Sequence, residues 1–244
     1  MKMLLIGYGK MGKAIEKLAI QRGHSIVDIV DAYNHQKLSE LIPGEVEVAI
    51  EFTEPTAAYS NIKECLSKGI PIISGTTGWL DKMDLLLKYC KEKNGTFFYS
   101  PNFSIGMNVF FQVNKCLARF MNQLLEYDIS IEEVHSVKKK DKPSGTSIAI
   151  AQHILANIER KKNWHLNPTT QKEDIEITSV RTEDTPGVHV VKYESKLDSI
   201  DFKHVANSTD TFATGVIMVA EWLGFQKGVL TMDDFMRYYF KLAC

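Results

Sequence analysis

The sequence predicts an α/β fold in two domains, in which a parallel sheet wound with helices is followed by an α+β domain with an open mixed sheet. The first observation is the apolar run Lys2–Ile6, which leads directly into a glycine turn, Gly7–Gly12, and then into a helical pattern. The second is the alternation of strand and helix patterns that continues to Asn102. The third is the change after Asn102 to strand patterns separated by hairpin-length gaps.

In the first domain each element follows from the spacing of its apolar residues. Short β-branched runs predict strands, and apolar residues at intervals of three and four predict helices. The first helix has Met11, Ile15, Leu18 and Ala19 on its apolar face. We expect strands at Lys2–Ile6, Ser25–Val30, Glu45–Phe52, Ile70–Ser74 and Thr96–Tyr99, and further helices at Thr56–Ser67 and Leu80–Lys93.

In the second half a long helical pattern, Gly106–Leu125, precedes an alternating β-branched segment, Asp128–Val137, which reads as a strand. A helix is expected from Thr146 to about Glu159. The remaining expected elements are strands at Ile175–Arg181, Val188–Tyr193 and Ile200–Val205 and helices at Thr211–Gly224 and Thr231–Leu242.

Composition limits the possible functions. The chain has 244 residues with 29 basic and 30 acidic side chains, and its net charge of -1 argues against nucleic acid or an anionic membrane as a partner. Its cysteines form no C-x-x-C pair, and no metal ligands cluster in the sequence, so we expect neither a disulfide framework nor a metal site. The start of the chain does not resemble a signal peptide, and no apolar run reaches membrane-spanning length. These features predict a soluble, cytoplasmic protein.

The glycine turn predicts a dinucleotide site, because it follows a strand and opens a helix. An ordinary strand-to-helix turn is the alternative. Asp31 ends the second strand, where a carboxylate can bind the adenosine ribose and repel a 2'-phosphate, so NADH is favoured over NADPH unless Lys37 reaches the site. The expected cofactor-binding residues here are Gly7, Tyr8, Gly9, Lys10, Met11, Gly12 and Asp31.

Two further loops follow strands at the edge of the sheet where such folds bind ligands. The first follows the fourth strand, and the second follows the fifth. Their small and hydroxyl side chains allow close approach to a nicotinamide, and Asn102 offers a partner for its carboxamide. We therefore add Gly75, Thr76, Thr77, Ser100, Pro101, Asn102 and Phe103 to the expected cofactor site.

The segment His135–Ser147 carries the second group of chemical residues. A histidine and a lysine can both exchange protons near neutral pH. Gly145 and Thr146 begin a helical pattern and can bind an anion at its N-terminus, which implies a small, doubly acidic substrate. The alternative is a solvated lysine run. If the preceding strand continues, His135 and Lys139 lie on one face of it, because their spacing is even.

Together these residues resemble the dihydrodipicolinate reductase family, also called the 4-hydroxy-tetrahydrodipicolinate reductases, of the diaminopimelate and lysine pathway. The resemblance runs nearly from end to end. It rests on Gly7–Gly12, Glu51–Pro55, Gly75–Gly78, Asn102–Asn108, Glu133–Thr146 and Thr211–Gly215.

The resemblance implies that the protein reduces 4-hydroxy-tetrahydrodipicolinate with NADH or NADPH and that water is lost. It implies a Rossmann-like nucleotide-binding domain at 1–103, completed by 214–244. It also implies a substrate-binding and oligomerisation domain at 104–213, which assembles a homotetramer.

By the same resemblance, His135 is the acid/base histidine, Lys139 is the proton donor, and Gly145 and Thr146 hold a substrate carboxylate. Ser136 stands where the family commonly has a second histidine that contributes to substrate binding, and Thr209 stands where it often has arginine. Serine can donate a hydrogen bond to a carboxylate but cannot carry a positive charge.

Two other functions remain open at this point. One is a different two-domain imino- or amino-acid reductase, such as an aspartate dehydrogenase. The other is a nucleotide sensor without catalysis. Among the other histidines, a structural role is favoured over substrate contact for His189 and His204. Surface or helix positions are expected for His24, His35, His153 and His165.

Overall fold

The computed structural model describes residues 1–42, 44–166, 168, 171–183, 185 and 187–241. The chain forms two compact units. Of the described residues, the first unit comprises Met1–Ile105 and Asp210–Lys241, and the second comprises most of Gly106–Thr209. In the described part of the chain, no helix has the length and apolar character needed to cross a membrane.

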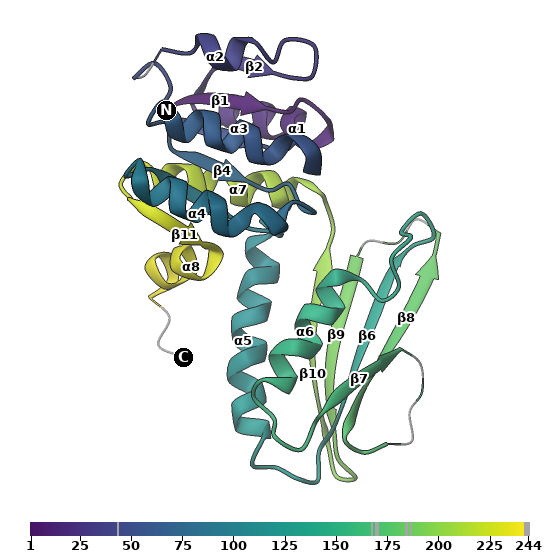
Figure 1. Cartoon of the computed structure of the whole chain (residues 1–244). Coiled ribbons are helices and arrows are strands. Elements are labelled where there is room, and N and C mark those ends of the chain that lie inside the picture. Colours follow the sequence, from purple (N-terminus) through teal and green to yellow (C-terminus); the bar gives the residue numbers. More distant parts are fainter. Residues whose placement is uncertain (43, 167, 169–170, 184, 186, 242–244) are drawn as a thin grey trace. The chain divides into compact units, whose positions relative to one another are not determined.

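The first unit contains a six-stranded parallel sheet in the order β11-β5-β4-β3-β1-β2 (Figure 1). Its buried strands are almost entirely apolar, as expected for a parallel sheet covered on both faces. The strands are β1 (Lys2–Ile6), β2 (Ser25–Val30), β3 (Val48–Glu51), β4 (Ile72–Ser74), β5 (Thr96–Tyr99) and β11 (Gly228–Thr231).

Alternation along β1 divides the core of this unit into two clusters. Met3 and Leu5 pack with α1, α7 and α8 on one face, whereas Leu4 and Ile6 pack with α2, α3 and α4 on the other. The chain from Asp210 onward therefore completes one face of the sheet. The helices are α1 (Lys10–Gln21), α2 (Lys37–Glu40), α3 (Pro55–Ser67), α4 (Met83–Glu92), α7 (Asp210–Leu223) and α8 (Met232–Phe240), and a 3₁₀ turn, η1 (Leu80–Lys82), precedes α4.

The second unit contains a five-stranded mixed sheet in the order β10-β9-β6-β8-β7 (Figure 1). The central strand β6 pairs antiparallel with β9 and parallel with β8. Helices α5 (Ile105–Met121) and α6 (Gly145–Leu155) pack on the same face, against buried residues such as Ile131, Ile177 and Val191. The strands are β6 (Asp128–Ser136), β7 (Asn163–Leu166), β8 (Asp174–Thr182), β9 (Gly187–Glu194) and β10 (Ser199–Ala206).

The predicted fold class is confirmed, and the differences lie in short or terminal segments. Three elements were not predicted, namely α2, β7 and β11, each of four residues. Several predicted elements were too long at their ends: the strand predicted at Glu45–Phe52 is only Val48–Glu51, and the helix from Gly106 ends at Met121. The predicted helix end at Leu242, like residues 243 and 244 of the predicted first domain, lies outside the described residues.

The glycine turn after β1 depends on close approach of the backbone. Gly7 has a φ of +96°, and a Cβ there would lie 2.0 Å from the carbonyl oxygen of Phe52. A Cβ on Gly12 would lie 2.3 Å from the carbonyl oxygen of Gly7. Both positions therefore require glycine, whereas a Cβ on Gly9 meets no atom within 4 Å.

We predict that Gly12→Ala lowers the free energy of unfolding, although alanine is intrinsically the better helix former. The cost should be about 1–3 kcal/mol, the range for overpacking, because the added methyl group meets a carbonyl oxygen that cannot move freely. Gly9→Ala is the matched control and should leave stability within about 0.5 kcal/mol of the original protein. Urea titration measures both, and equal stabilities would contradict the close packing of this turn.

Candidate active site

The carboxyl ends of β1, β2 and β3 surround a cleft of about 560 Å³ in the first unit. Four predicted cofactor residues, Gly7, Tyr8, Gly9 and Asp31, line this cleft. Lys13 also lines it, with its ammonium 5.6 Å from the ring centroid of Tyr8. Lys10, Met11 and Gly12 lie in the first turn of α1 and are not part of the lining.

Asp31 is held in a tight turn at the end of β2. Its carboxylate accepts a hydrogen bond of 2.8 Å from the backbone N–H of Tyr33, and its own N–H donates to Oδ1 of Asn34 at 2.7 Å. The ammonium of Lys37, the cation nearest to Asp31 in the sequence, pairs with the carboxylate of Asp28 at 2.9 Å. The lysine lowers the pKa of Asp28, although partial burial opposes that shift.

Glu51 organises the loops beside this cleft, although the sequence identified it only as part of the motif Glu51–Pro55 and not as a site residue. Its carboxylate is fully buried and accepts hydrogen bonds from the N–H and hydroxyl of Thr53 and from the hydroxyls of Ser74 and Thr76. It thereby ties the loop after β3 to the loop after β4. Thr53, in turn, contributes to the lining of the cleft.

The other predicted cofactor residues lie in the loops after β4 and β5. Thr76 is buried beside Glu51, and Gly75 donates its N–H to the carbonyl of Glu51 at 3.0 Å. Thr77 follows them in the same loop. After β5, Ser100 Oγ donates to the carbonyl of Asn102 at 2.8 Å, and Pro101 lies between these two residues.

Phe103 lies in the apolar core of the first unit, where it packs against Phe52 and Phe98. The described structure therefore places the ring of Phe103 in a packing role. None of the predicted residues in these two loops lines the 560 Å³ cleft itself.

These features fit a nicotinamide dinucleotide. Gly7 and Gly12 allow the tight turn at the start of α1, Gly9 leaves open space beside it in which a pyrophosphate would fit, and the cleft places a carboxylate at the end of the next strand. When bound, a reduced nicotinamide supplies hydride to an acceptor.

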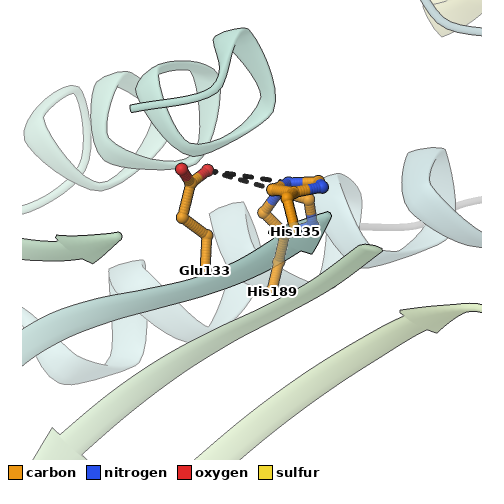
Figure 2. A group of neighbouring side chains, drawn as sticks. All are labelled: Glu133, His135 and His189. Atoms are coloured by element: carbon orange, nitrogen blue, oxygen red, sulfur yellow. Dashed lines mark hydrogen bonds and ion pairs between the residues drawn. The ribbon is translucent and has the colours of Figure 1, made fainter. Parts of the chain in front are cut away.

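The second unit carries a polar cluster on the face of its sheet that α5 and α6 cover. Glu133 and His135 are two residues apart on β6, so their side chains point to the same side of the sheet. His189 lies on the neighbouring strand β9 and is paired with Glu133 in the ladder. Figure 2 shows the Glu133 carboxylate directed toward the two imidazole rings. The fold therefore joins residues that are 54 positions apart in the sequence.

Glu133 is the centre of this cluster. Its fully buried carboxylate accepts hydrogen bonds from the Ser144 N–H at 3.0 Å, the Ser147 hydroxyl at 2.7 Å and the Arg181 guanidinium at 2.9 Å, and also from the Ser179 hydroxyl. Burial alone would raise the pKa of this carboxyl. The hydrogen bonds outweigh burial and lower the pKa to about 2, so the group is ionised near neutral pH.

The two histidines have lowered pKa values. Burial is the largest cause for His135, the positive charges of Lys139 and Arg181 add to it, and Glu133 opposes it. Burial also lowers the pKa of His189, to about 3, with His135 as the next largest cause. Both imidazoles are therefore neutral near pH 7. Nε2 of His189 lies 3.3 Å from Nε2 of His135, so the residue for which a structural role is favoured contacts the predicted acid/base histidine.

Lys139 does not lie on the strand face on which it was expected. The strand β6 ends at Ser136, and Lys139 then turns back to donate its N–H to the carbonyl of Ser136 at 3.0 Å. The argument from even spacing was therefore wrong. The Lys139 ammonium pairs with Asp141 at 2.9 Å and lowers the pKa of that carboxyl, and the backbone N–H of Gly145 contributes to the same shift.

The predicted anion site is the first turn of α6. Ser144 is the N-cap residue, whose hydroxyl accepts a hydrogen bond of 3.1 Å from the N–H of Ser147. Gly145 and Thr146 follow as the first helical residues, so their N–H groups belong to the positive end of the helix. Because Glu133 accepts from Ser144 and Ser147, the same carboxylate anchors both His135's strand and this helix start.

Side-chain atoms of Glu133, His135 and His189 that could bind a metal lie within 4.8 Å of one another. Sequence spacing did not reveal this grouping, because His189 comes from a distant strand. The Glu133 oxygens are already used by their hydrogen-bond donors, and the nearby Arg181 charge disfavours a cation. A hydrogen-bonded network therefore explains the cluster better than a metal site does.

The fold and its two sites define a class of protein, the NAD(P)H-dependent reductases that combine a Rossmann-like sheet with a second mixed sheet. More particularly, the chain belongs to the dihydrodipicolinate reductase family. The family model described as "Dihydrodipicolinate reductase, N-terminus" matches residues 1–103, and the one described as "Dihydrodipicolinate reductase, C-terminus" matches residues 106–236.

Curated relatives agree with this assignment. A 4-hydroxy-tetrahydrodipicolinate reductase from Christiangramia forsetii is 42% identical over 243 residues, which cover 99% of this chain and 100% of the relative. One from Lawsonia intracellularis is 33% identical and covers 96% of this chain and 98% of its own. A solved structure, the dipicolinate-bound dihydrodipicolinate reductase from Paenisporosarcina sp. TG-14, shares the fold with a TM-score of 0.79 at 19% identity, covering 97% of this chain and 99% of its own. The resemblance drawn from the sequence motifs is confirmed.

We predict that Glu133 makes the stability of the protein depend on pH in the acid range. Because its folded-state pKa of about 2 lies below the ordinary 4.5, the stabilisation is present above pH 4.5 and is lost as pH falls toward 2. The difference in unfolding free energy between the original protein and Glu133→Gln should therefore shrink by about 3 kcal/mol between pH 6 and pH 2.

Urea titrations at several pH values measure this difference. Glu132→Gln is the matched control, since its carboxylate is partly exposed and pairs with Lys192 at 3.0 Å. A pair at that exposure should contribute about 1 kcal/mol or less. If Glu133→Gln and the original protein lost stability in parallel, the assigned ionisation of Glu133 would be wrong.

Proposed function

We propose that the protein reduces 4-hydroxy-tetrahydrodipicolinate to tetrahydrodipicolinate with NADH or NADPH, with loss of water, as a step in diaminopimelate and lysine biosynthesis. The observation that carries the proposal is the network in which Glu133 holds the His135 strand and the start of α6 together. That network joins an acid/base group to an anion-binding turn. The names of the full-length relatives identify the substrate that suits it.

In this proposal each predicted site residue of the second unit has its own role in binding or proton transfer. Gly145 and Thr146 bind one substrate carboxylate through backbone and hydroxyl groups, and Ser136 offers a further hydrogen bond. His135 orients the ring and exchanges protons with it. Lys139 donates a proton to the ring carbon next to the one that accepts hydride, which neutralises the negative charge left there. Water has left the ring before the hydride is accepted, so the atoms and charges balance.

The direct test is to mix the purified protein with freshly prepared hydroxy-tetrahydrodipicolinate and follow nicotinamide absorbance. Oxidation of the cofactor only when this substrate is present supports the proposal. Oxidation with another imino acid alone would favour a different reductase, and binding of nucleotide without turnover would favour a sensor. The resemblance also supports a homotetramer in the cytoplasm, which we include in the proposal.

We predict that Lys139→Ala lowers turnover by about two to four powers of ten, the usual effect of losing a general acid, while NADH affinity stays near normal. The physical reason is that Lys139 is held beside the start of α6 by its turn onto Ser136 and its ion pair with Asp141. Steady-state kinetics measures the loss. Lys138→Ala is the neighbouring control, and a larger effect there would place the proton donor elsewhere.

We further propose that NADH is preferred over NADPH. Asp31 lies in the cleft with its carboxylate fixed by the Tyr33 N–H, and the Lys37 ammonium is engaged by Asp28. A 2'-phosphate near Asp31 would meet a negative charge without a matching cation from Lys37.

Replacing Asp31 by serine together with Ala32→Arg should shift the ratio of specificity constants toward NADPH by about 1–3 kcal/mol, the scale of one charge-assisted hydrogen bond. Kinetics with both cofactors decides the matter. The single substitution Ala32→Arg, with Asp31 retained, is the control. It separates the effect of adding a cation from the effect of removing the carboxylate. A strong preference of the original protein for NADPH would contradict the proposal.

A further inference from the structure

His189 is in contact with His135 and is buried in the second unit, with 4% of its surface exposed. Its Nε2 faces three polar atoms: Oγ of Ser144 at 3.2 Å, Nε2 of His135 at 3.3 Å and Oε2 of Glu133 at 3.9 Å. Its Nδ1 is buried and has no hydrogen-bond partner among the described residues. The two nitrogens of this ring therefore have very different surroundings.

These surroundings decide which nitrogen of His189 carries the proton. A neutral imidazole has one N–H donor and one acceptor. A proton on Nδ1 would be a buried donor without an acceptor, whereas a proton on Nε2 faces an oxygen, a nitrogen and a carboxylate. Ser144 Oγ accepts one bond from the Ser147 N–H and can accept another, so the Nε2–H tautomer of His189 is favoured.

This tautomer constrains His135. The N–H on Nε2 of His189 is shared between Ser144 Oγ at 3.2 Å and Nε2 of His135 at 3.3 Å. A proton on Nε2 of His135 as well would oppose two donors at 3.3 Å, and the Glu133 oxygen, 3.7 Å from that nitrogen, is beyond hydrogen-bond distance, so Nε2 of His135 is favoured as an acceptor. The remaining proton of a neutral His135 must then sit on Nδ1. The Nδ1–Cε1 edge of the ring passes over Gly187, where a Cβ would come within 3.1 Å of Cε1 and 3.3 Å of Nδ1.

We propose that His189 is a positioning residue that holds His135 in its Nδ1–H tautomer, so that His135 presents this N–H to the substrate as a hydrogen-bond donor. The proposal rests on the function proposed above for its catalytic part. The tautomer itself is a property of the protein without substrate. Glu133 supports this arrangement by keeping Ser144 in place through the N–H of that residue.

The charged and titratable groups around His135 and His189 are consistent with both imidazole rings being neutral. On β6, the Glu133 charge partly offsets the lowered pKa of His135, and Lys139 and Asp141 act on it from the turn after that strand. Arg181 approaches from β8. His204 lies opposite His189 on β10, and it too contributes to the lowered pKa of His189.

The tautomer can be observed directly by NMR. In protein labelled with ¹⁵N-histidine, long-range ¹H–¹⁵N correlation distinguishes a protonated ring nitrogen from an unprotonated one, and His135→Gln assigns the signals. We expect His135 to show a protonated Nδ1 and an unprotonated Nε2 near pH 7. A protonated Nε2 with an unprotonated Nδ1 in the original protein would overturn the proposal, whatever the variants do.

Two substitutions test whether His189 is the cause. His189→Met removes the donor, so His135 should change to the Nε2–H form that a free imidazole prefers. His189→Gln retains an amide donor at similar reach and should keep the Nδ1–H form. His204→Met, at the position paired with His189 in the ladder, is the control and should change neither signal. An unchanged His135 tautomer in a folded His189→Met protein would overturn the proposal.

Kinetics connects the tautomer to the proposed activity. His189→Met should lower kcat about tenfold, the effect of one lost hydrogen bond, without changing KM for NADH, and His189→Gln should recover most of the loss. The apparent pKa of His135 should rise in His189→Met, because an N–H no longer opposes its protonation. If His189→Met changed the tautomer of His135 but had the same kcat as the original protein, the proposed effect of the tautomer on catalysis would be overturned. If the original protein had no reductase activity but His135 was in the Nδ1–H form, the proposed function would be refuted and the assignment of the tautomer would stand.

Discussion

The ionised carboxylate of Glu133 is the interaction on which the second unit depends. It accepts hydrogen bonds from the start of α6 and from two residues of β8, while its own strand β6 carries His135. Removing a buried charge of this kind leaves several donors unsatisfied, which is far more costly than losing an exposed ion pair. A single side chain therefore ties the strand that carries the His135 imidazole to the first turn of α6.

The first unit uses a buried carboxylate for a related purpose but satisfies it differently. Glu51 accepts hydrogen bonds from hydroxyl and backbone donors of Thr53, Ser74 and Thr76, whereas Glu133 also pairs with Arg181. In both units the carboxylate joins the end of one strand to a neighbouring segment. The side chains that touch a ligand can then come from loops, because buried anions hold those loops to rigid strands.

Much of the fold could be predicted because apolar spacing reports directly on burial. The strands Lys2–Ile6, Ser25–Val30 and Thr96–Tyr99 were predicted with their observed bounds, since each is a short apolar run next to a polar turn. The edge strand β11 was missed because its four residues alternate between half-buried and exposed positions and carry a weak pattern. Helix α5 ends before its predicted end because Leu124 and Leu125, which extended the apolar pattern, are exposed.

The candidate site was predictable only in part, for a related reason. His135, Lys139, Gly145 and Thr146 are close in sequence and form a recognisable motif. His189 contributes through the register of β6 with β9, which no local pattern encodes. The spacing of Glu133 and His135 on one strand face was the available signal, because it placed a charged group beside the histidine on the side that faces the helices.

The serine that replaces the family's second histidine can be understood from the same geometry. Ser136 is the last residue of β6, and its hydroxyl accepts a hydrogen bond of 3.4 Å from the N–H of Lys138 in the turn that follows. It holds Lys139 through its backbone carbonyl rather than through its side chain. If the resemblance holds at this position, serine in place of histidine leaves out a titratable side chain, while the main-chain hydrogen bond from Lys139 to Ser136 does not depend on which side chain is present. The identity of the side chain at Ser136 therefore bears on charge at the end of β6 and not on the position of the proposed proton donor.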